Sequence, residues 1–153
     1  MEFKKRERFT LSKVGNMEET RILVVDDEPF IRTLLIDLVS DLDLQSDEAE
    51  NGLAALELLK VKDYHVVLSD IKMPAMGGIE LFENALKLNI FTPFIFLTGY
   101  SDDEMIIKAL RLGAIDFLGK PFLPLELSNV IARTIELGQR RLELMKEIKS
   151  SQR

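Results

Sequence analysis

The chain has 153 residues, of which 46% are hydrophobic, so it is long enough to form one domain with a full core. It contains no cysteine, which excludes a disulfide framework, a thiolate metal site and a cysteine nucleophile. The formal net charge of −6 disfavours nucleic-acid binding through the body of the protein. No apolar run approaches the length of a membrane span, and the N-terminus lacks a signal-peptide core, so we expect a soluble cytoplasmic protein.

The charge is unevenly distributed along the chain. Residues 1–13 carry a local charge of +3 and residues 136–153 a local charge of +2, which leaves an acidic middle that suits a bound cation. Residues 1–19 show no clean periodicity, and we expect a flexible basic extension there. The pattern then predicts one folded domain over residues 20–138 and a charged helical tail over residues 139–153.

Five short runs rich in β-branched and apolar residues predict strands. Four of them are nearly continuous in apolar residues, which is typical of parallel strands covered on both faces. The second run is polar enough to be the edge of a sheet. The predicted strands are Arg21–Val25, Leu44–Ala49, Tyr64–Leu68, Pro93–Leu97 and Ile115–Leu118.

Helical patterns lie between and after these runs, with apolar residues spaced by three and four. Pro29 suits a first helical turn, and Asn51 and Ser101 are residue types that cap helix N-termini. The repeats cover Ile31–Leu38, Ala55–Leu59, Ile79–Leu86, Ile106–Gly113 and Leu127–Ile135. This alternation predicts an α/β fold, a doubly wound five-stranded parallel sheet of order 2-1-3-4-5 with five helices on its two faces.

The last helix can continue into the tail, because Gly138 is a weak stop and Leu142, Met145 and Ile148 keep a rough helical spacing. Two interpretations of this tail stay open. It is a frayed helical end, or it is a coiled-coil-like seam through which the chain forms a homodimer or binds a partner.

Chemically active residues follow the predicted strands. Asp26 and Asp27 follow the first strand, Asp70 the third, Thr98 the fourth and Lys120 the fifth. In a doubly wound sheet, ligands bind outside the carboxyl ends of the strands. Three carboxylates at one edge repel one another unless a positive charge lies among them, and an all-oxygen site suits Mg²⁺.

A carboxylate whose charge is neutralised can attack an activated phosphoryl group and become an aspartyl phosphate. The Lys120 ammonium, the Thr98 hydroxyl and Mg²⁺ would stabilise the charge on the phosphoryl oxygens. The nucleophile should be Asp70, on the central strand and apart from the acidic pair. Taken singly, these residues are ordinary turn, cap or surface residues, so the prediction depends on their joint placement. The only histidine, His65, begins a strand, and we expect an ordinary role for it rather than metal ligation.

Four segments of the chain resemble the bacterial response-regulator receiver domains of two-component systems. They are VVDDEP at 24–29, SDIKMPAMGGIEL at 69–81, TGY at 98–100 and DFLGKPF at 116–122, and the likeness extends over residues 21–137. The resemblance implies a flavodoxin-like, CheY-like fold of the stand-alone, single-domain type. It also implies that Asp70 accepts a phosphoryl group from a phosphohistidine on a sensor histidine kinase.

The resemblance further assigns roles around Asp70. Asp26 and Asp27 are expected to form the acid pocket for Mg²⁺, with Asp27, Asp70 and the backbone carbonyl of Lys72 as direct ligands. Lys120 is expected to pair with the phosphoryl group and to precede Pro121 through a cis bond. Thr98 and Phe117 resemble a switch pair, in which the hydroxyl moves towards the phosphate and the ring turns inward. Lys72 and Tyr100 occupy positions that resemble those through which the family tunes phosphoryl lifetime.

The function expected from these residues is a phosphorylation switch that acts through protein contacts. Its output surface would combine the helix over Ile106–Gly113, the strand over Ile115–Leu118 and the helix after Pro124. We expect no DNA-binding domain, no membrane contact and no enzyme activity beyond the domain's own phosphorylation and dephosphorylation.

Alternative functions are a phosphorelay intermediate that passes phosphate to a histidine phosphotransfer protein, and an Mg²⁺-dependent phosphohydrolase. Such hydrolases need a second carboxylate two residues after the nucleophile, where this chain has Lys72. A flavodoxin-like cofactor binder fits less well, because no phosphate-binding loop follows the first strand.

Overall fold

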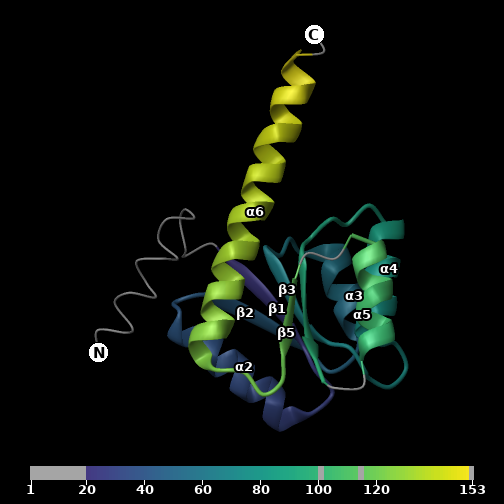
Figure 1. The fold of residues 1–153 in the computed structure, drawn as a ribbon, viewed down its shortest axis with the longest axis vertical. Helices are drawn as coiled ribbons and strands as arrows, with labels where there is room; N and C mark the ends of the chain where they lie inside the picture. Colours follow the sequence, from purple (N-terminus) through teal and green to yellow (C-terminus); the bar gives the residue numbers. More distant parts are fainter. Residues whose placement is uncertain (1–19, 100–101, 114–115, 152–153) are drawn as a thin grey trace.

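The computed structural model describes residues 20–99, 102–113 and 116–151 (Figure 1). The predictions of an N-terminal extension over residues 1–19, of an N-cap at Ser101 and of a role for Tyr100 lie outside these residues. The strands are β1 (Arg21–Val25), β2 (Gln45–Ala49), β3 (Val66–Asp70), β4 (Phe94–Thr98) and β5 (Asp116–Gly119). The helices are α2 (Pro29–Asp41), α3 (Gly52–Val61), α4 (Gly78–Lys87), α5 (Asp103–Arg111) and α6 (Pro124–Ser151).

All strand pairs are parallel, and the strand order is β2-β1-β3-β4-β5, which confirms the predicted doubly wound sheet. The polar strand β2 lies at an edge, as expected from its composition. Strand β3 begins two residues later than predicted, because Tyr64 lies outside the sheet with its hydroxyl donating a hydrogen bond of 2.6 Å to Asp47 Oδ2. The strand consequently extends to Asp70, which is in register with Leu97 of β4.

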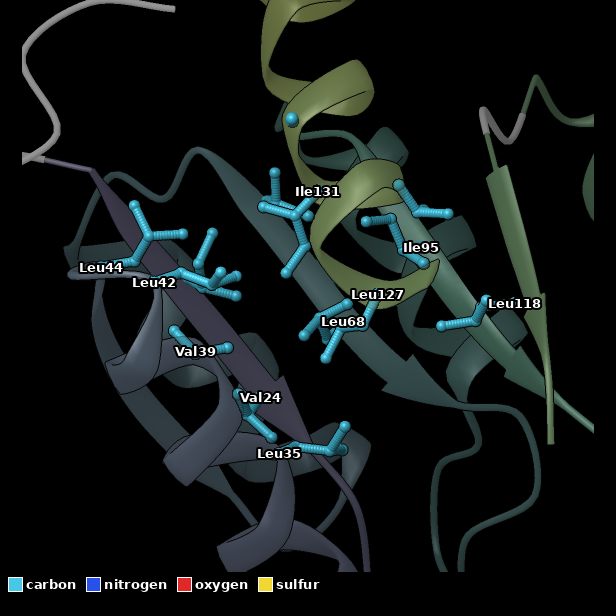
Figure 2. Packing of buried hydrophobic residues seen from close by; sticks show 14 of the residues in the cluster. Val24, Leu35, Val39, Leu42, Leu44, Leu68, Ile95, Leu118, Leu127 and Ile131 are labelled. Carbon is cyan, nitrogen blue, oxygen red and sulfur yellow. The ribbon is translucent and has the colours of Figure 1, made fainter. Parts of the chain in front are cut away.

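The core has two layers, one on each face of the sheet. Side chains alternate along each strand, so Ile22 and Val24 point to one face and Leu23 and Val25 to the other. Helices α2 and α6 cover the first face, and Figure 2 shows Leu35 of α2 and Leu127 of α6 packed there. Helices α3, α4 and α5 contribute the apolar residues of the second face. Burial on both faces accounts for the continuous apolar runs in the strands.

Two helix starts agree with the residue types found there. Pro29 occupies the first turn of α2, and the Asn51 side chain accepts a 2.8 Å hydrogen bond from the backbone N–H of Ala54 at the start of α3. Both predictions are confirmed. Residue Asp102 precedes α5, but its carboxylate accepts a hydrogen bond from Gly99 N–H rather than from the helix.

Some residues of the apolar repeats face solvent. Leu34 of α2 is 43% exposed and Leu110 of α5 is 55% exposed, although both belong to regular helical repeats. The face of each helix that meets the sheet is narrow: α2 fully buries Leu35 and Val39, and α5 buries only Ala109. Helix α5 is therefore weakly anchored to the domain.

Helix α6 continues without a break from Pro124 to Ser151, as predicted from the weak stop at Gly138. Its first half packs on the sheet through Leu127, Ile131 and Ile135, whereas its second half projects away from the domain (Figure 1). Across the described residues, every helix is too short or too polar to cross a membrane.

Candidate functional site

Three carboxylates meet at the carboxyl ends of the two central strands. Asp26 and Asp27 follow β1, and Asp70 is the last residue of the neighbouring strand β3. One carboxylate oxygen from each residue lies within 4.8 Å of the others. The structure therefore brings together the three aspartates that the sequence pattern singled out.

The loop between β1 and α2 is held in a defined conformation. Asp26 is fully buried, and its Oδ1 accepts a hydrogen bond of 2.9 Å from the backbone N–H of Glu28. Arg32, one turn into α2, donates a hydrogen bond of 2.7 Å from its guanidinium to the backbone carbonyl of Asp26 and forms an ion pair with Glu48. This contact ties the loop to α2 and fixes the direction of the acidic pair.

Lys120 supplies positive charge to the cluster. Its Nζ lies 3.3 Å from Asp70 Oδ1 and 4.0 Å from Asp26 Oδ2. Its backbone N–H donates a hydrogen bond of 2.8 Å to the carbonyl of Thr98, which aligns the residue after β5 with the end of β4. The peptide bond between Lys120 and Pro121 is cis, as the resemblance implies.

The electrostatics of the site favour the binding of a cation. Burial is the main cause that raises the pKa values of both Asp26 and Asp70 above the usual aspartate range, and neighbouring carboxylates raise them further. Lys120 and the backbone N–H groups of Glu28 and Ile71 act in the opposite direction without cancelling the effect of burial. A positive charge among the three carboxylates would stabilise their ionised forms.

The donor set fits Mg²⁺. The side chains that could hold the ion offer only carboxylate oxygens, which this cation prefers. Asp26 Oδ2 is buried and accepts no hydrogen bond from the part of the chain that the structure describes, so it is an orphaned acceptor facing the cluster. Asp27 and Asp70 are each only partly buried, so solvent reaches the cluster.

The loop after β3 depends on a close backbone contact at Gly78. A Cβ atom at Gly78 would collide with the carbonyl oxygen of Asp70 and would lie 2.9 Å from Ser69 Oγ. The Gly78 N–H donates a hydrogen bond of 2.8 Å to the carbonyl of Ile71, so the start of α4 is packed directly under the acidic residue. Glycine is required here for close approach rather than for a left-handed conformation.

Thr98 and Phe117 occupy neighbouring strands. Thr98 is the last residue of β4 and is buried, in register with Gly119 of β5. The half-buried ring of Phe117 stacks on Phe96 with a centroid separation of 5.7 Å. The ring therefore already contacts the α3–α5 face of the core in this conformation.

His65 lies apart from the cluster, as expected. Its side chain is exposed, and Nδ1 accepts a hydrogen bond of 3.2 Å from the backbone N–H of Arg21.

Two residues that contact the loops of the site, Arg32 and Asp102, were not predicted, because the search considered only residues that directly follow a predicted strand. A basic residue one turn into the helix that follows the acidic pair is the only sequence feature that could have indicated Arg32.

The family model of the response regulator receiver domain matches residues 22–132 of this chain. The chain is 35% identical to the chemotaxis protein CheY of Thermotoga maritima over 105 aligned residues. These residues make up 68% of this chain and 88% of that protein. The chain is also 36% identical to the regulatory protein AtoC of Escherichia coli over 124 aligned residues, which make up 81% of this chain. The chain belongs to the response-regulator receiver domain family and is a signalling domain of two-component systems.

Solved structures agree with this assignment. The receiver domain protein from Methanospirillum hungatei superposes with a TM-score of 0.75 at 29% identity, over 80% of this chain and 98% of the other. An uncharacterized protein from Neptuniibacter caesariensis gives a TM-score of 0.77 at 30% identity, over 84% and 96% of the two chains. The aligned region spans 27% of the length of AtoC, so the likeness concerns only about a quarter of that regulator.

The contact at Gly78 predicts a specific loss of stability. Gly78→Ala should lower the free energy of unfolding by about 1–3 kcal/mol, because the added methyl group must displace the Asp70 carbonyl or α4. Gly119→Ala is the matched control at the same edge of the sheet, since no atom lies within 4 Å of the position that its Cβ would take. Urea denaturation of both variants tests this, and equal stabilities would contradict it.

Proposed function

We propose that the domain accepts a phosphoryl group on Asp70 from a sensor histidine kinase, with Mg²⁺ bound by Asp26, Asp27 and Asp70. The observation that carries the proposal is the position of the Asp70 carboxylate, 3.3 Å from the Lys120 ammonium and within one cluster with the acidic pair. The domain is expected to act in the cytoplasm, where the catalytic part of such a kinase would meet it.

In the proposed reaction, a carboxylate oxygen of Asp70 attacks the phosphorus atom of a phosphohistidine. The bond between that oxygen and phosphorus forms as the bond between phosphorus and the imidazole nitrogen breaks, and the imidazole leaves with the bonding electron pair. Lys120 holds positive charge beside the transferred group, and we expect the hydroxyl of Thr98, at the end of the neighbouring strand β4, to donate a hydrogen bond to it. Bound Mg²⁺ would neutralise charge on the carboxylates and on the phosphoryl oxygens, and the backbone carbonyl of Lys72 is a further proposed protein ligand.

The proposed output is a change in the surface formed by α5, β5 and α6. We expect Thr98, at the end of β4, and Phe117, which pairs in β5 with Phe96, to connect the site to this surface. Helix α5 fully buries only Ala109, with Met105 and Ile106 partly buried against the core, so it is held by fewer buried side chains than α4 and is the helix we expect to shift. Phosphorylation can then bias two arrangements of this surface and so change its affinity for a downstream protein.

A phosphohydrolase is a weaker candidate for the same site. Lys72 occupies the position two residues after Asp70 where such enzymes need a second carboxylate, and its side chain extends to Asp102. No aspartate or glutamate takes its place in the metal-binding group formed by the described residues, which contains only Asp26, Asp27 and Asp70.

Acetyl phosphate with Mg²⁺ should add one phosphoryl group to the protein, and Asp70→Asn should abolish the addition, because an amide is not a nucleophile for this reaction. Intact-protein mass spectrometry measures the added mass. Asp37→Asn, which changes an exposed aspartate on α2, is the matched control and should be labelled like the wild type. Full labelling of the Asp70→Asn variant would refute Asp70 as the acceptor.

Mg²⁺ should stabilise the folded protein, by about 2.7 kcal/mol at a hundred times its dissociation constant, and excess EDTA should remove the effect. Asp27→Asn should lose most of this stabilisation but should be at least as stable as the wild type without metal, because it relieves repulsion between carboxylates. Thermal unfolding with and without Mg²⁺ measures both effects. An equal Mg²⁺ effect in the wild type and Asp27→Asn would exclude the proposed ligand set.

The projecting half of α6 supports a proposal about assembly. Leu137, Leu144 and Ile148 are 43%, 58% and 56% exposed, and together with Arg141 they follow the four-three spacing of a coiled-coil seam. Leucine and isoleucine in these alternate seam positions favour a parallel pair of helices. We therefore favour the dimer seam over the frayed tail.

If the chain forms a dimer through this seam of α6, its mass in solution should be that of two chains. Size-exclusion chromatography with light scattering should give about twice the 17.5 kDa of one chain. Leu144→Ser combined with Ile148→Ser should give the mass of a single chain. Glu143→Ser combined with Ser150→Ala, on the opposite side of the helix, should leave the dimer intact. A wild type that elutes as a single chain at high micromolar concentration would contradict the proposal.

A further inference from the structure

The loop between β3 and α4 is attached to the start of α3. Gly52, the first residue of α3, donates a hydrogen bond of 3.0 Å from its backbone N–H to the carbonyl oxygen of Met76 in this loop. The Met76 side chain is buried in the core on the α3–α5 face, and its sulfur accepts a hydrogen bond of 3.8 Å from the amide of Asn84. The tip of the loop is thus held both by its backbone and by its side chain.

The approach of the loop to α3 requires a glycine at position 52. A Cβ atom there would lie 2.6 Å from the carbonyl oxygen of Met76, 2.7 Å from its Cγ and 2.9 Å from its Cβ. All three separations are shorter than van der Waals contact. A side chain at position 52 must therefore push aside either the start of α3 or the loop.

The start of α3 is held more firmly than the loop. Asn51 caps the helix, and Ala55 and Leu59 are buried against the core. Residues 71–75 of the loop, in contrast, border an open cavity of about 520 Å³, to which Met105 of α5 also contributes. None of the residues that line this cavity belongs to α3. The loop consequently has space to move into when it is pushed away from α3.

The conformation of the loop depends on support from outside it. Ala75, directly before Met76, has a φ of 67°, a left-handed conformation that is costly for a residue with a side chain and persists only where its surroundings hold it. The ends of the loop are joined by a hydrogen bond of 2.8 Å from the Gly78 N–H to the Ile71 carbonyl. With these ends fixed, a displacement of Met76 is taken up by the residues between them, which include Lys72.

We propose that Gly52 is a positioning residue of the metal site, because its close contact with Met76 sets the position of the loop and hence of the Lys72 carbonyl. This inference rests on the proposed Mg²⁺ site, in which that carbonyl is one of the ligands. Mg²⁺ demands nearly ideal octahedral geometry, so a displaced carbonyl weakens its binding. Gly52 acts through the loop and touches neither the metal nor the phosphoryl group.

The inference predicts the affinity for Mg²⁺. Gly52→Ala should raise the dissociation constant roughly ten-fold, as expected when a group that supports a metal ligand is disturbed. Isothermal titration calorimetry of the full chain with magnesium chloride measures this constant. Val39→Ala is the matched control, because it lowers stability by removing buried methyl groups on the face of the sheet opposite to Met76. Its dissociation constant should equal that of the wild type.

Met76→Ala tests the same contact from the loop and remains informative if Gly52→Ala does not fold. It removes the buried side chain that anchors the tip of the loop but keeps the backbone hydrogen bond to Gly52. The dissociation constant for Mg²⁺ should therefore rise by a smaller factor. In the double variant the rise should be smaller than the product of the two single effects, because the added methyl group no longer meets the Met76 Cγ.

Two further measurements separate positioning from a general loss of stability. At saturating Mg²⁺, Gly52→Ala should be phosphorylated by acetyl phosphate at a rate that approaches the wild-type rate, whereas at the wild-type dissociation constant it should react roughly five-fold more slowly, as follows from the ten-fold weaker binding. Without metal, hydrogen exchange of residues 71–78 relative to β1, followed by mass spectrometry, should be faster in Gly52→Ala and unchanged in Val39→Ala.

The possible results separate this inference from the proposed function. A wild type that binds no Mg²⁺ overturns both. If the wild type binds Mg²⁺, an unchanged dissociation constant in Gly52→Ala overturns only the inference, as does an equal rise in Val39→Ala or slow phosphorylation of Gly52→Ala at saturating Mg²⁺. If Gly52→Ala does not fold, a wild-type constant in Met76→Ala overturns the inference. Weaker binding in both loop-contact variants, with wild-type binding in Val39→Ala, supports it.

Discussion

Mutual repulsion among three carboxylates is the constraint on which the rest of the site depends. The carboxylate oxygens of Asp26, Asp27 and Asp70 lie within 4.8 Å of one another, and burial raises the pKa values of Asp26 and Asp70. Such a cluster is stable only with positive charge at hand, and Lys120 provides one such charge. The proposed binding of a second cation and the proposed acceptance of a phosphoryl group would have the same electrostatic origin.

The fold supplies this arrangement from distant parts of the sequence. The carboxyl ends of parallel strands lie at the same edge of the sheet. Residues separated by about a hundred positions in the sequence therefore lie close together in the structure. The loops at this edge are then fixed by separate devices, namely the Arg32 contact with the Asp26 carbonyl and the close packing of Gly78 under Asp70. The core on both faces keeps the strand ends in place, while α5 fully buries only Ala109 and belongs to the surface proposed to respond to phosphorylation.

The strand order, the edge position of β2, the cap at Asn51 and the continuation of α6 were all predictable, because each follows from a local pattern or from a topological rule. The clustering of the aspartates with Lys120 followed from placing them at strand ends. The start of β3, the exposure of Leu34 and the roles of Arg32 and Asp102 were not predictable. They depend on which side of a helix meets the sheet and on long side chains that cross between loops, and neither leaves a periodic signal in one sequence.

If repulsion among the carboxylates governs the site, the acidic cluster becomes a phosphoryl acceptor only when a cation completes its charge balance. The most direct test is the initial rate of phosphorylation by acetyl phosphate across a titration of Mg²⁺ at constant ionic strength. The rate should rise and saturate with Mg²⁺ and should fall to the background in EDTA. An equal rate in EDTA and in saturating Mg²⁺ would show that the cluster needs no added cation, contrary to the proposed electrostatic origin of its reactivity.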